Sequence, residues 1–167
     1  MKYYPKMALL GLLLLGLFAG SAGAAEKPLR KARDNRIRAQ ELVNQMMRCH
    51  PELLLGGVRA TAPGEPGPTI VASTLDRIGA EDDEGDISVG VGGRTILVPG
   101  LKNPDRFGLS IPLKDSSGKR IGVLALAFKP MVEEDETRVF PLGTAIRNEL
   151  PLKIPALESL FFPSHEP

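Results

Sequence analysis

Two segments joined by a short turn restrict the fold of this chain more than any other feature. In residues 106–113, apolar side chains alternate with small or polar ones, which indicates a strand with one buried face. In residues 119–129, apolar side chains occupy both faces, so this strand is expected in the middle of a sheet. The turn Asp115-Ser-Ser-Gly118 lies between them. An antiparallel hairpin is therefore the first prediction.

Three further strands are expected earlier in the chain. Residues 53–60 and the β-branched residues 69–74 flank a Gly/Pro-rich turn, which predicts a second hairpin, and residues 94–99 form another short strand. Residues 75–93 contain an acidic run and five glycines, so they are expected to form a long loop over one face of the domain, which could include a helical turn.

Helices are expected at both ends of this set of strands. Residues 29–50 are amphipathic and should form a long helix that ends before Pro51. Residues 142–160 repeat apolar side chains at spacings of three and four, although Pro151 and Pro155 should divide this helix. The predicted fold class is α+β, an antiparallel sheet of about five strands with a long N-terminal helix and a C-terminal helix.

The first 25 residues have the pattern of a secretory signal peptide. Lys2 and Lys6 precede an apolar run over residues 7–19, and small residues follow as far as Ala25. We expect cleavage and a periplasmic or secreted protein. An uncleaved anchor is the alternative, and only then would the protein be bound to a membrane. The predicted division is a signal peptide over 1–25, one domain over 26–162 and a C-terminal tail over 163–167.

Composition and charge limit the classes of partner. The 167 residues are 43% hydrophobic, which suits one domain with a hydrophobic core. The chain has 21 basic and 20 acidic residues, so its net charge of +1 does not favour nucleic acid as a partner. Cys49 is the single cysteine, so no disulfide can form within the chain. We expect it to be a small buried side chain, with pairing between two chains as the alternative.

The residues that could support catalysis or metal binding are few. The two histidines are His50 and His165, and no nucleophile-elbow or zinc-protease motif places Ser73 and an aspartate beside His50. The acidic run 81–86 lacks the ligand spacing of an EF-hand, so a solvated loop is expected. We therefore expect no enzyme, no catalytic residue, no bound metal and no cofactor.

Three segments resemble a known family of sensor domains. They are Thr69-Ile-Val-Ala-Ser-Thr74, Arg77-Ile78-Gly79 and Ser110-Ile-Pro-Leu-Lys-Asp-Ser-Ser-Gly-Lys-Arg-Ile-Gly-Val-Leu-Ala-Leu126. Together they resemble the Cache branch of the PAS-like extracytoplasmic sensor domains, over roughly residues 34–129. The resemblance implies that a small molecule is sensed in a pocket between the sheet and the long loop. It also implies coupling through helices to a signalling protein that spans the membrane.

Four polar residues near the ends of the strands are the candidate ligand-binding residues: Ser73, Arg77, Asp86 and Arg106. Either arginine could bind a carboxylate through paired hydrogen bonds, and Asp86 could bind an amine. Each of the four could instead satisfy a loop backbone or form a surface ion pair. The expected apolar lining, which could equally be plain core, consists of Phe107, Leu109, Leu124 and Leu126.

Two functions are compatible with these features. The first is an exported, non-enzymatic, small-molecule-binding, sensor-like domain that acts with a separate partner. The second is a structural or interaction domain of the cell envelope, without a ligand pocket, that docks through its terminal helices or an exposed Phe161-Phe162 pair. A polar cavity between sheet and loop favours the first function, and large side chains filling that space favour the second.

Overall fold

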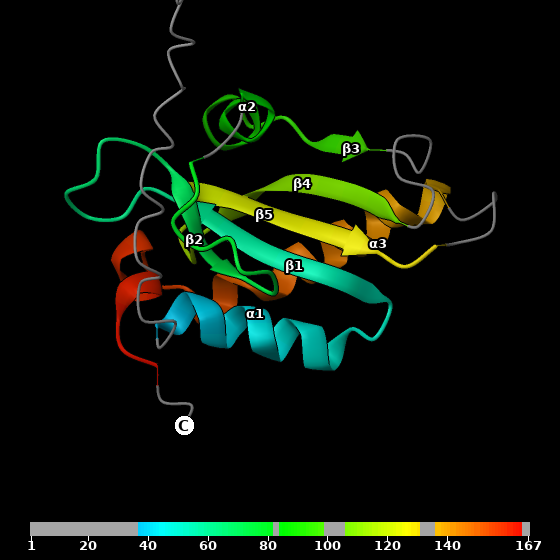
Figure 1. The fold of residues 1–167 in the computed structure, drawn as a ribbon, viewed down its shortest axis with the longest axis horizontal. Helices are drawn as coiled ribbons and strands as arrows, with labels where there is room; N and C mark the ends of the chain where they lie inside the picture. Colours follow the sequence, from blue (N-terminus) through cyan, green and yellow to red (C-terminus); the bar gives the residue numbers. More distant parts are fainter. Residues whose placement is uncertain (1–36, 82–83, 99–105, 131–135, 165–167) are drawn as a thin grey trace, which may run out of the picture.

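A five-stranded antiparallel sheet forms the centre of the molecule (Figure 1). The structure, a computed structural model, describes residues 37–81, 84–98, 106–130 and 136–164. The sheet has the order β2-β1-β5-β4-β3. The strands are β1 (Leu53–Ala60), β2 (Thr69–Ser73), β3 (Ile96–Val98), β4 (Phe107–Lys114) and β5 (Arg120–Phe128). The predicted α+β class and antiparallel sheet are confirmed, and β5 occupies the central position that its two apolar faces predicted.

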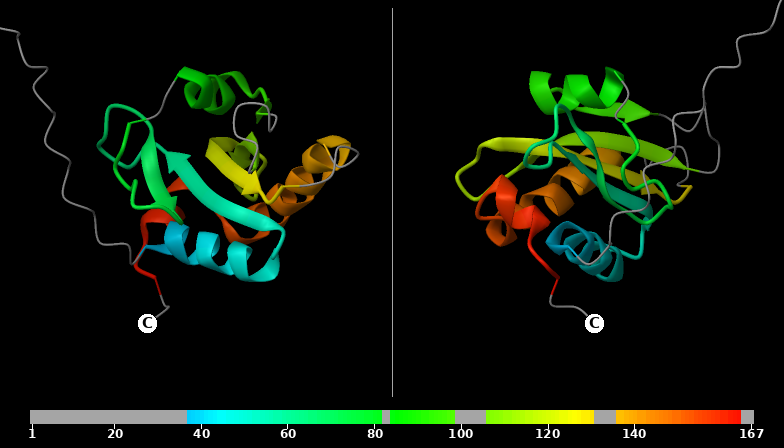
Figure 2. Two further views of the ribbon diagram at one scale, coloured as in Figure 1. Left: turned by 45° about the vertical axis from the view of Figure 1, so that its right-hand side comes forward. Right: turned by 60° about the vertical axis from the view of Figure 1, so that its left-hand side comes forward.

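The helices cover the two faces of the sheet unequally. α1 (Arg38–Cys49) and α3 (Glu136–Glu149) lie on one face, and α2 (Glu84–Gly92) lies on the other (Figures 1 and 2). Two short 3-10 helices, η3 (Pro151–Lys153) and η4 (Leu157–Phe161), follow α3. The sheet is thus sealed by two helices on one face and by a single short helix on the other.

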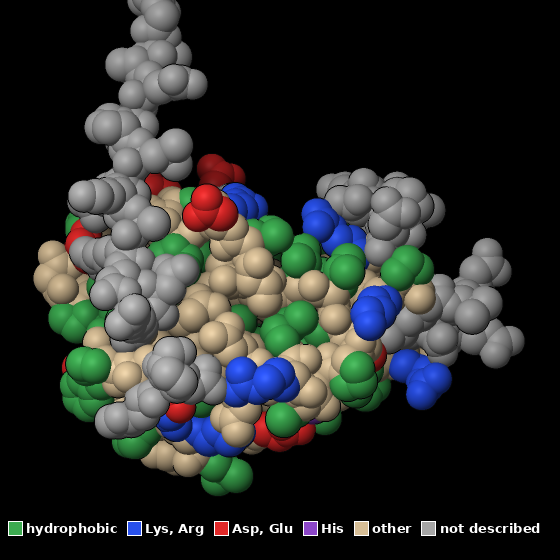
Figure 3. All heavy atoms as spheres, turned by 60° about the horizontal axis from the view of Figure 1, so that its bottom comes forward, with side chains coloured by type: hydrophobic (Ala, Val, Ile, Leu, Met, Phe, Trp, Pro, Cys, Tyr) green, Lys and Arg blue, Asp and Glu red, His purple; other side chains and the backbone are tan. Residues whose placement is uncertain are grey.

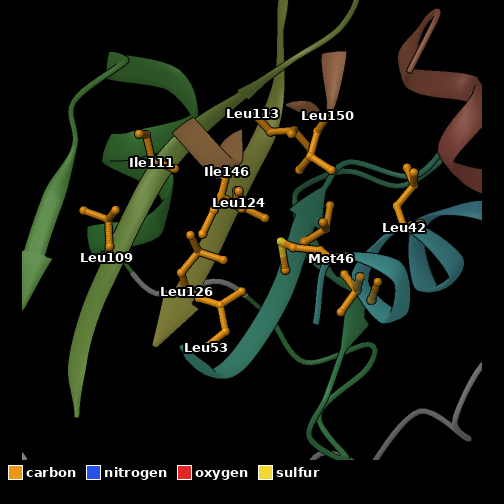
Figure 4. Packing of buried hydrophobic residues seen from close by; sticks show 14 of the residues in the cluster. Leu42, Met46, Leu53, Leu109, Ile111, Leu113, Leu124, Leu126, Ile146 and Leu150 are labelled. Carbon is orange, nitrogen blue, oxygen red and sulfur yellow. The ribbon is translucent and has the colours of Figure 1, made fainter. Parts of the chain in front are cut away.

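The hydrophobic core lies between the sheet and the pair α1 and α3. Leu124 and Leu126 of β5 point toward Ile146 of α3, and Met46 of α1 closes the core beside β1 (Figure 4). Leu124 is fully buried and Ile146 is 1% exposed, so this layer excludes water. The core continues to η4, where Leu160 is fully buried.

The β1–β5 pairing and the β4–β5 turn both depend on glycine. A Cβ atom at Gly122 of β5 would collide with the carbonyl oxygen of Arg59 in β1, so only glycine allows this close approach. Gly118 has a φ of 84° in the turn between β4 and β5, a backbone conformation that other residues rarely adopt. The turn predicted at Gly118 is therefore confirmed.

The carboxylate of Asp115 holds the same turn together. It accepts hydrogen bonds from the hydroxyl of Ser117 at 2.7 Å and from the backbone N–H groups of Ser117 and Lys119, each at 3.0 Å. The Ser117 hydroxyl is the main cause that lowers the pKa of Asp115, and burial acts in the opposite direction. The buried charge at Asp115 is therefore satisfied within the turn.

The helices differ from the sequence prediction at three points. Residues 84–92 form α2 instead of a loop, because Asp86 and Val89 dock onto the sheet and this packing outweighs the weak helix propensity of three glycines. α1 begins at Arg38, after the extended residue Ile37, whereas residues 29–36 of the predicted helix lie outside the described residues. α3 begins six residues before 142, and the helix contains Pro141.

Cys49 and the N-terminal segment complete the comparison. Cys49 is exposed at the end of α1, so the expectation of a buried side chain was wrong, because this position faces away from the sheet. The predicted signal peptide, residues 1–25, lies outside the described residues. Within the described ranges, no helix has the length and apolar character needed to cross a membrane. The predicted domain boundaries stay a prediction.

Candidate functional site

A cavity of about 230 Å³ lies between α2 and the sheet. Its walls come from the end of β1, the first half of β5 and one side of α2, and they include Arg59, Val123 and Gly90. An added Cβ at Gly90 would lie 3.3 Å from the Val123 side chain, so glycine here allows α2 to lie close to β5. The cavity is therefore formed where α2 crosses the sheet, on the face opposite the main core.

A buried ion pair forms the polar wall of this cavity. The Nη2 atom of Arg59 lies 2.8 Å from Oδ2 of Asp86, and the side chains are 15% and 9% exposed. The other carboxylate oxygen, Oδ1, accepts a hydrogen bond of 2.9 Å from the hydroxyl of Ser110 in β4. Asp86 thus joins α2 to β1 and β4, on either side of β5. The site offers a guanidinium, a carboxylate and a hydroxyl close together.

The local sequence explains why these groups meet. Val58 and Ala60 point into the main core, so Arg59 between them points to the α2 face. A register shift between Val58 and Arg59 in the β1–β2 pairing marks the same point. Asp86 lies in the first turn of α2, where a negative charge is stabilised by the helix dipole. Strand alternation and helix position together bring the two charges onto one face.

Of the four predicted ligand-binding residues, the structure places Asp86 at this cavity. Ser73 lies on the α1 side, where its backbone N–H donates to Oε1 of Gln40 at 2.9 Å and its hydroxyl accepts from the N–H of Leu75 at 3.0 Å. Arg77 is exposed in the loop after β2 and does not line the cavity. Neither Ser73 nor Arg77 lines this cavity, and a ligand-binding role for them stays a prediction.

Arg106 and the predicted apolar lining also lie elsewhere. Arg106 is half-buried just before β4, four residues from Ser110, or about 13 Å along the strand. The expected apolar lining residues are buried in the main core, on the face covered by α1 and α3: Phe107, Leu109, Leu124 and Leu126. They do not line the cavity beneath α2, because side chains alternate between the two faces along β4 and β5 and these four point to the opposite face.

His50 is not a neighbour of the predicted ligand-binding residues. Its Nδ1 atom lies 3.3 Å from Glu52 and its Nε2 atom lies 3.2 Å from Glu149. The backbone N–H of Ser73 donates to Gln40. Gln40 precedes His50 by ten residues, which corresponds to about 15 Å along α1. The hypothetical grouping of Ser73, an aspartate and His50 is thus not assembled.

Arg59 and Ser110 belong to the site and were not predicted from the sequence. A signal for Arg59 was available, because it is the one charged residue in the strand Leu-Leu-Leu-Gly-Gly-Val-Arg-Ala. Ser110 stands among apolar residues in β4 in the same way. Neither residue could be matched to Asp86 from the sequence, since the match depends on strand order and on α2.

The comparisons with known proteins concern the fold. No protein-family model and no curated protein matches the sequence. The GAF domain of nlh2 from A. aeolicus, solved in an inactive state, is similar with a TM-score of 0.53 and 13% identity, and the likeness covers 68% of this chain and 80% of that one. The chain therefore has a GAF/PAS-like α+β fold. The likeness is to a GAF domain and does not reach the Cache branch specifically.

Two other solved structures are similar at lower scores. The GAF domain of a two-component sensor histidine kinase from Bacillus halodurans has a TM-score of 0.47 and 17% identity, covering 68% of this chain and 91% of that one. The inducer-binding domain of the transcription factor PobR from Acinetobacter, in complex with 3-hydroxybenzoic acid, has a TM-score of 0.42 and 12% identity, covering 68% and 95%.

Proposed function

We propose that this chain is an exported, non-enzymatic, sensor-like domain that binds a small molecule and acts with a separate partner. The observation that carries the proposal is the cavity beneath α2 with the buried pair Arg59 and Asp86 in its wall. A cavity with charged groups in its wall, between the sheet and the helix that covers it, favours ligand binding over a purely structural domain. The GAF/PAS-like fold is consistent with this function, and a Cache-type extracytoplasmic sensor remains the finer form of the proposal.

The chemistry of the cavity suggests the class of ligand. The guanidinium of Arg59 suits a carboxylate, and the carboxylate of Asp86 suits an amine, so a small carboxylate or amine is the proposed ligand. The volume of about 230 Å³ is below the roughly 300–1,000 Å³ of sites for drug-sized molecules. The ligand is therefore expected to be no larger than a small organic acid, an amine or an amino acid.

A thermal-shift screen of the purified protein tests the ligand. Amino acids, carboxylic acids and amines are added at constant ionic strength, and a ligand at a hundred times its Kd should stabilise the fold by about 2.7 kcal/mol. Asp86→Asn and Ser110→Ala should weaken the response to the same compound. Arg77→Ala is the matched control, since Arg77 is exposed and outside the cavity. A panel without any hit, or a hit equally weakened by Arg77→Ala, would contradict the proposal.

Export is tested separately from binding. If residues 1–25 are a signal peptide, the protein recovered outside the cytoplasm should begin at Glu26. N-terminal sequencing of the protein after expression gives the answer directly. An intact N-terminus with the protein in the membrane fraction would favour the uncleaved anchor, and an intact N-terminus in the cytoplasm would contradict export.

An interaction domain of the cell envelope is the second candidate. Leu152 is 87% exposed and Phe162 is 61% exposed, and both belong to the C-terminal segment. Phe161, however, packs partly against the core, so the predicted exposed pair is a single exposed phenylalanine. In Figure 3, where the side that carries α1 comes forward, hydrophobic side chains form several small groups among charged and neutral ones. The described hydrophobic side chains on this face therefore do not join into one broad patch of the kind that marks a docking surface.

A further inference from the structure

A second, larger hollow lies beside the turn between β4 and β5. Its volume is about 420 Å³, which is within the roughly 300–1,000 Å³ range of small-molecule sites. Three parts of the chain line it: the segment after α2, the β4–β5 hairpin and α3 between Phe140 and Arg147. The hollow is distinct from the cavity beneath α2, although the long side chain of Arg120 lines both.

Three cationic side chains surround this hollow. They are Lys114 at the end of β4, Arg120 at the start of β5 and Arg147 on α3. Among the described residues that line it, none is acidic. The lining therefore carries a concentrated positive charge, although the chain as a whole has a net charge of only +1.

Two of these cations are direct partners across the hairpin. Lys114 and Arg120 stand opposite each other in the β4–β5 register. Like charges in such positions repel each other and destabilise the pairing. A folded domain gains nothing from this arrangement by itself, whereas an anion bound between the two side chains would convert repulsion into attraction.

The cations are not neutralised by other described parts of the chain. Arg147 donates to two neutral acceptors, the carbonyl oxygen of Pro112 at 3.2 Å and Oδ1 of Asn148 at 2.8 Å. Within the described ranges, Lys114 and Arg120 form no ion pair with a carboxylate, and Asp115 next to them is bound inside its own turn. Arg147 is thus held in position by neutral acceptors, and no carboxylate of the described residues compensates its charge.

A threonine hydroxyl on α3 provides a separate indication of a ligand. Thr144 is one of the residues that line the hollow, and its Oγ1 atom is buried and has no hydrogen-bond partner among the described residues. Such a group costs free energy unless a ligand or a water molecule satisfies it. Phe140, one turn earlier on α3, is 50% exposed and offers an apolar surface at the same hollow.

We propose that this hollow binds a small organic anion with at least two negative charges, held by Lys114, Arg120 and Arg147. Two sources share this chemistry, the multivalent carboxylates and the organic phosphates, and both accept charge-assisted hydrogen bonds from arginine and lysine. The Thr144 hydroxyl supplies a neutral donor, and Phe140 contacts the apolar part of the molecule. The site requires an anion, in contrast to the charge-balanced pair beneath α2.

Isothermal titration of the purified protein at constant ionic strength tests the proposal, with citrate and pyrophosphate as multivalent probes and acetate as a monovalent reference. We expect one site for at least one multivalent probe and at least about tenfold weaker binding in Lys114→Gln, the loss of one charge-assisted hydrogen bond. Thr144→Val should also weaken binding without lowering the melting temperature. Arg77→Gln removes one positive charge outside the hollow and should change the affinity less than twofold.

The outcomes separate the two sources and the two sites. Binding of citrate alone would assign the site to carboxylates, and binding of pyrophosphate alone would assign it to phosphates. Binding of both would show that the site recognises multiple negative charges of either kind. Absence of binding by both probes at millimolar concentration, an unchanged affinity in Lys114→Gln, or an equal loss in Arg77→Gln overturns the proposal. Lys114 does not line the cavity beneath α2 and Asp86 does not line this hollow, so failure of either proposal leaves the other intact.

Discussion

The guanidinium of Arg59 on β1 lies 2.8 Å from the carboxylate of Asp86 on α2, and both side chains are largely buried. The pair spans the central strand β5, because Asp86 also accepts a hydrogen bond from Ser110 on β4. α2 is the one described helix on this face of the sheet. The ion pair therefore positions the helix that covers the candidate cavity.

Removal of either charge should destabilise the fold. Asp86→Asn leaves the Arg59 guanidinium buried beside a neutral amide, and we expect a loss of about 3 kcal/mol in the free energy of unfolding. Arg59→Met should have a similar cost, because it removes the guanidinium that lies 2.8 Å from the largely buried carboxylate of Asp86. Urea denaturation of both single variants and of the double variant gives the coupling energy, expected at about 2 kcal/mol. Strictly additive losses in the double variant would show that the two side chains do not stabilise each other.

The close approach of β1 and β5 at Gly122 makes a second prediction. Gly122→Ala places a methyl group against the backbone carbonyl of Arg59, which cannot move without disturbing the sheet, so we expect a loss of about 2 kcal/mol. Gly67→Ala is the control, since nothing lies within 4 Å of a Cβ atom added at Gly67. The free energy of unfolding of this variant should change by less than about 0.5 kcal/mol. Thermal and urea denaturation measure both, and equal effects of the two changes would contradict the steric explanation.

The sheet was predictable because the features that indicate its strands and turns lie within short segments of the sequence. Alternation in β4 and the doubly apolar β5 fix which side chains are buried, and the turn at Gly118 joins the two strands. α2 was not predictable in the same way, because its glycine-rich sequence becomes helical through contacts with strands distant in the sequence. Helix formation there is a consequence of the tertiary fold.

The candidate site was predictable only in part for the same reason. Asp86 could be chosen as a polar residue near the sheet, but its partners Arg59 and Ser110 lie 27 and 24 positions away in the sequence and on different strands. The hollow with Lys114 and Arg120 was missed although both residues flank a predicted turn. The third cation, Arg147, comes from a helix whose position relative to the hairpin is a property of the assembled layers.

The C-terminal segment should contribute to stability through one residue. Leu160 in η4 is fully buried against the core, and Leu160→Ala should lower the free energy of unfolding by about 3 kcal/mol. Leu152, which is 87% exposed in the same segment, is the matched control, and Leu152→Ala should change stability by less than about 0.5 kcal/mol. Similar losses for the two variants would mean that the segment does not pack as described.

The turn at Asp115 should give the protein a measurable dependence on acid. The folded-state pKa of Asp115 is lowered, first by the Ser117 hydroxyl, so the unfolded chain binds more protons than the folded one as the pH falls below the ordinary aspartate value of about 3.9. The stability that Asp115 contributes is therefore present above that value. It is lost as the pH falls through the lowered pKa.

Asp115→Asn isolates this contribution. The variant should be less stable than the unaltered protein at neutral pH, because an amide oxygen is a weaker acceptor for the Ser117 hydroxyl and the Lys119 N–H than a carboxylate. The difference should shrink as the pH falls below about 4, where the carboxyl group of the unaltered protein takes up its proton. Asp76→Asn, in an exposed loop, controls for the loss of one negative charge. Urea denaturation between neutral pH and pH 3 measures all three proteins, and a difference that stays constant over that range would rule out the turn as its source.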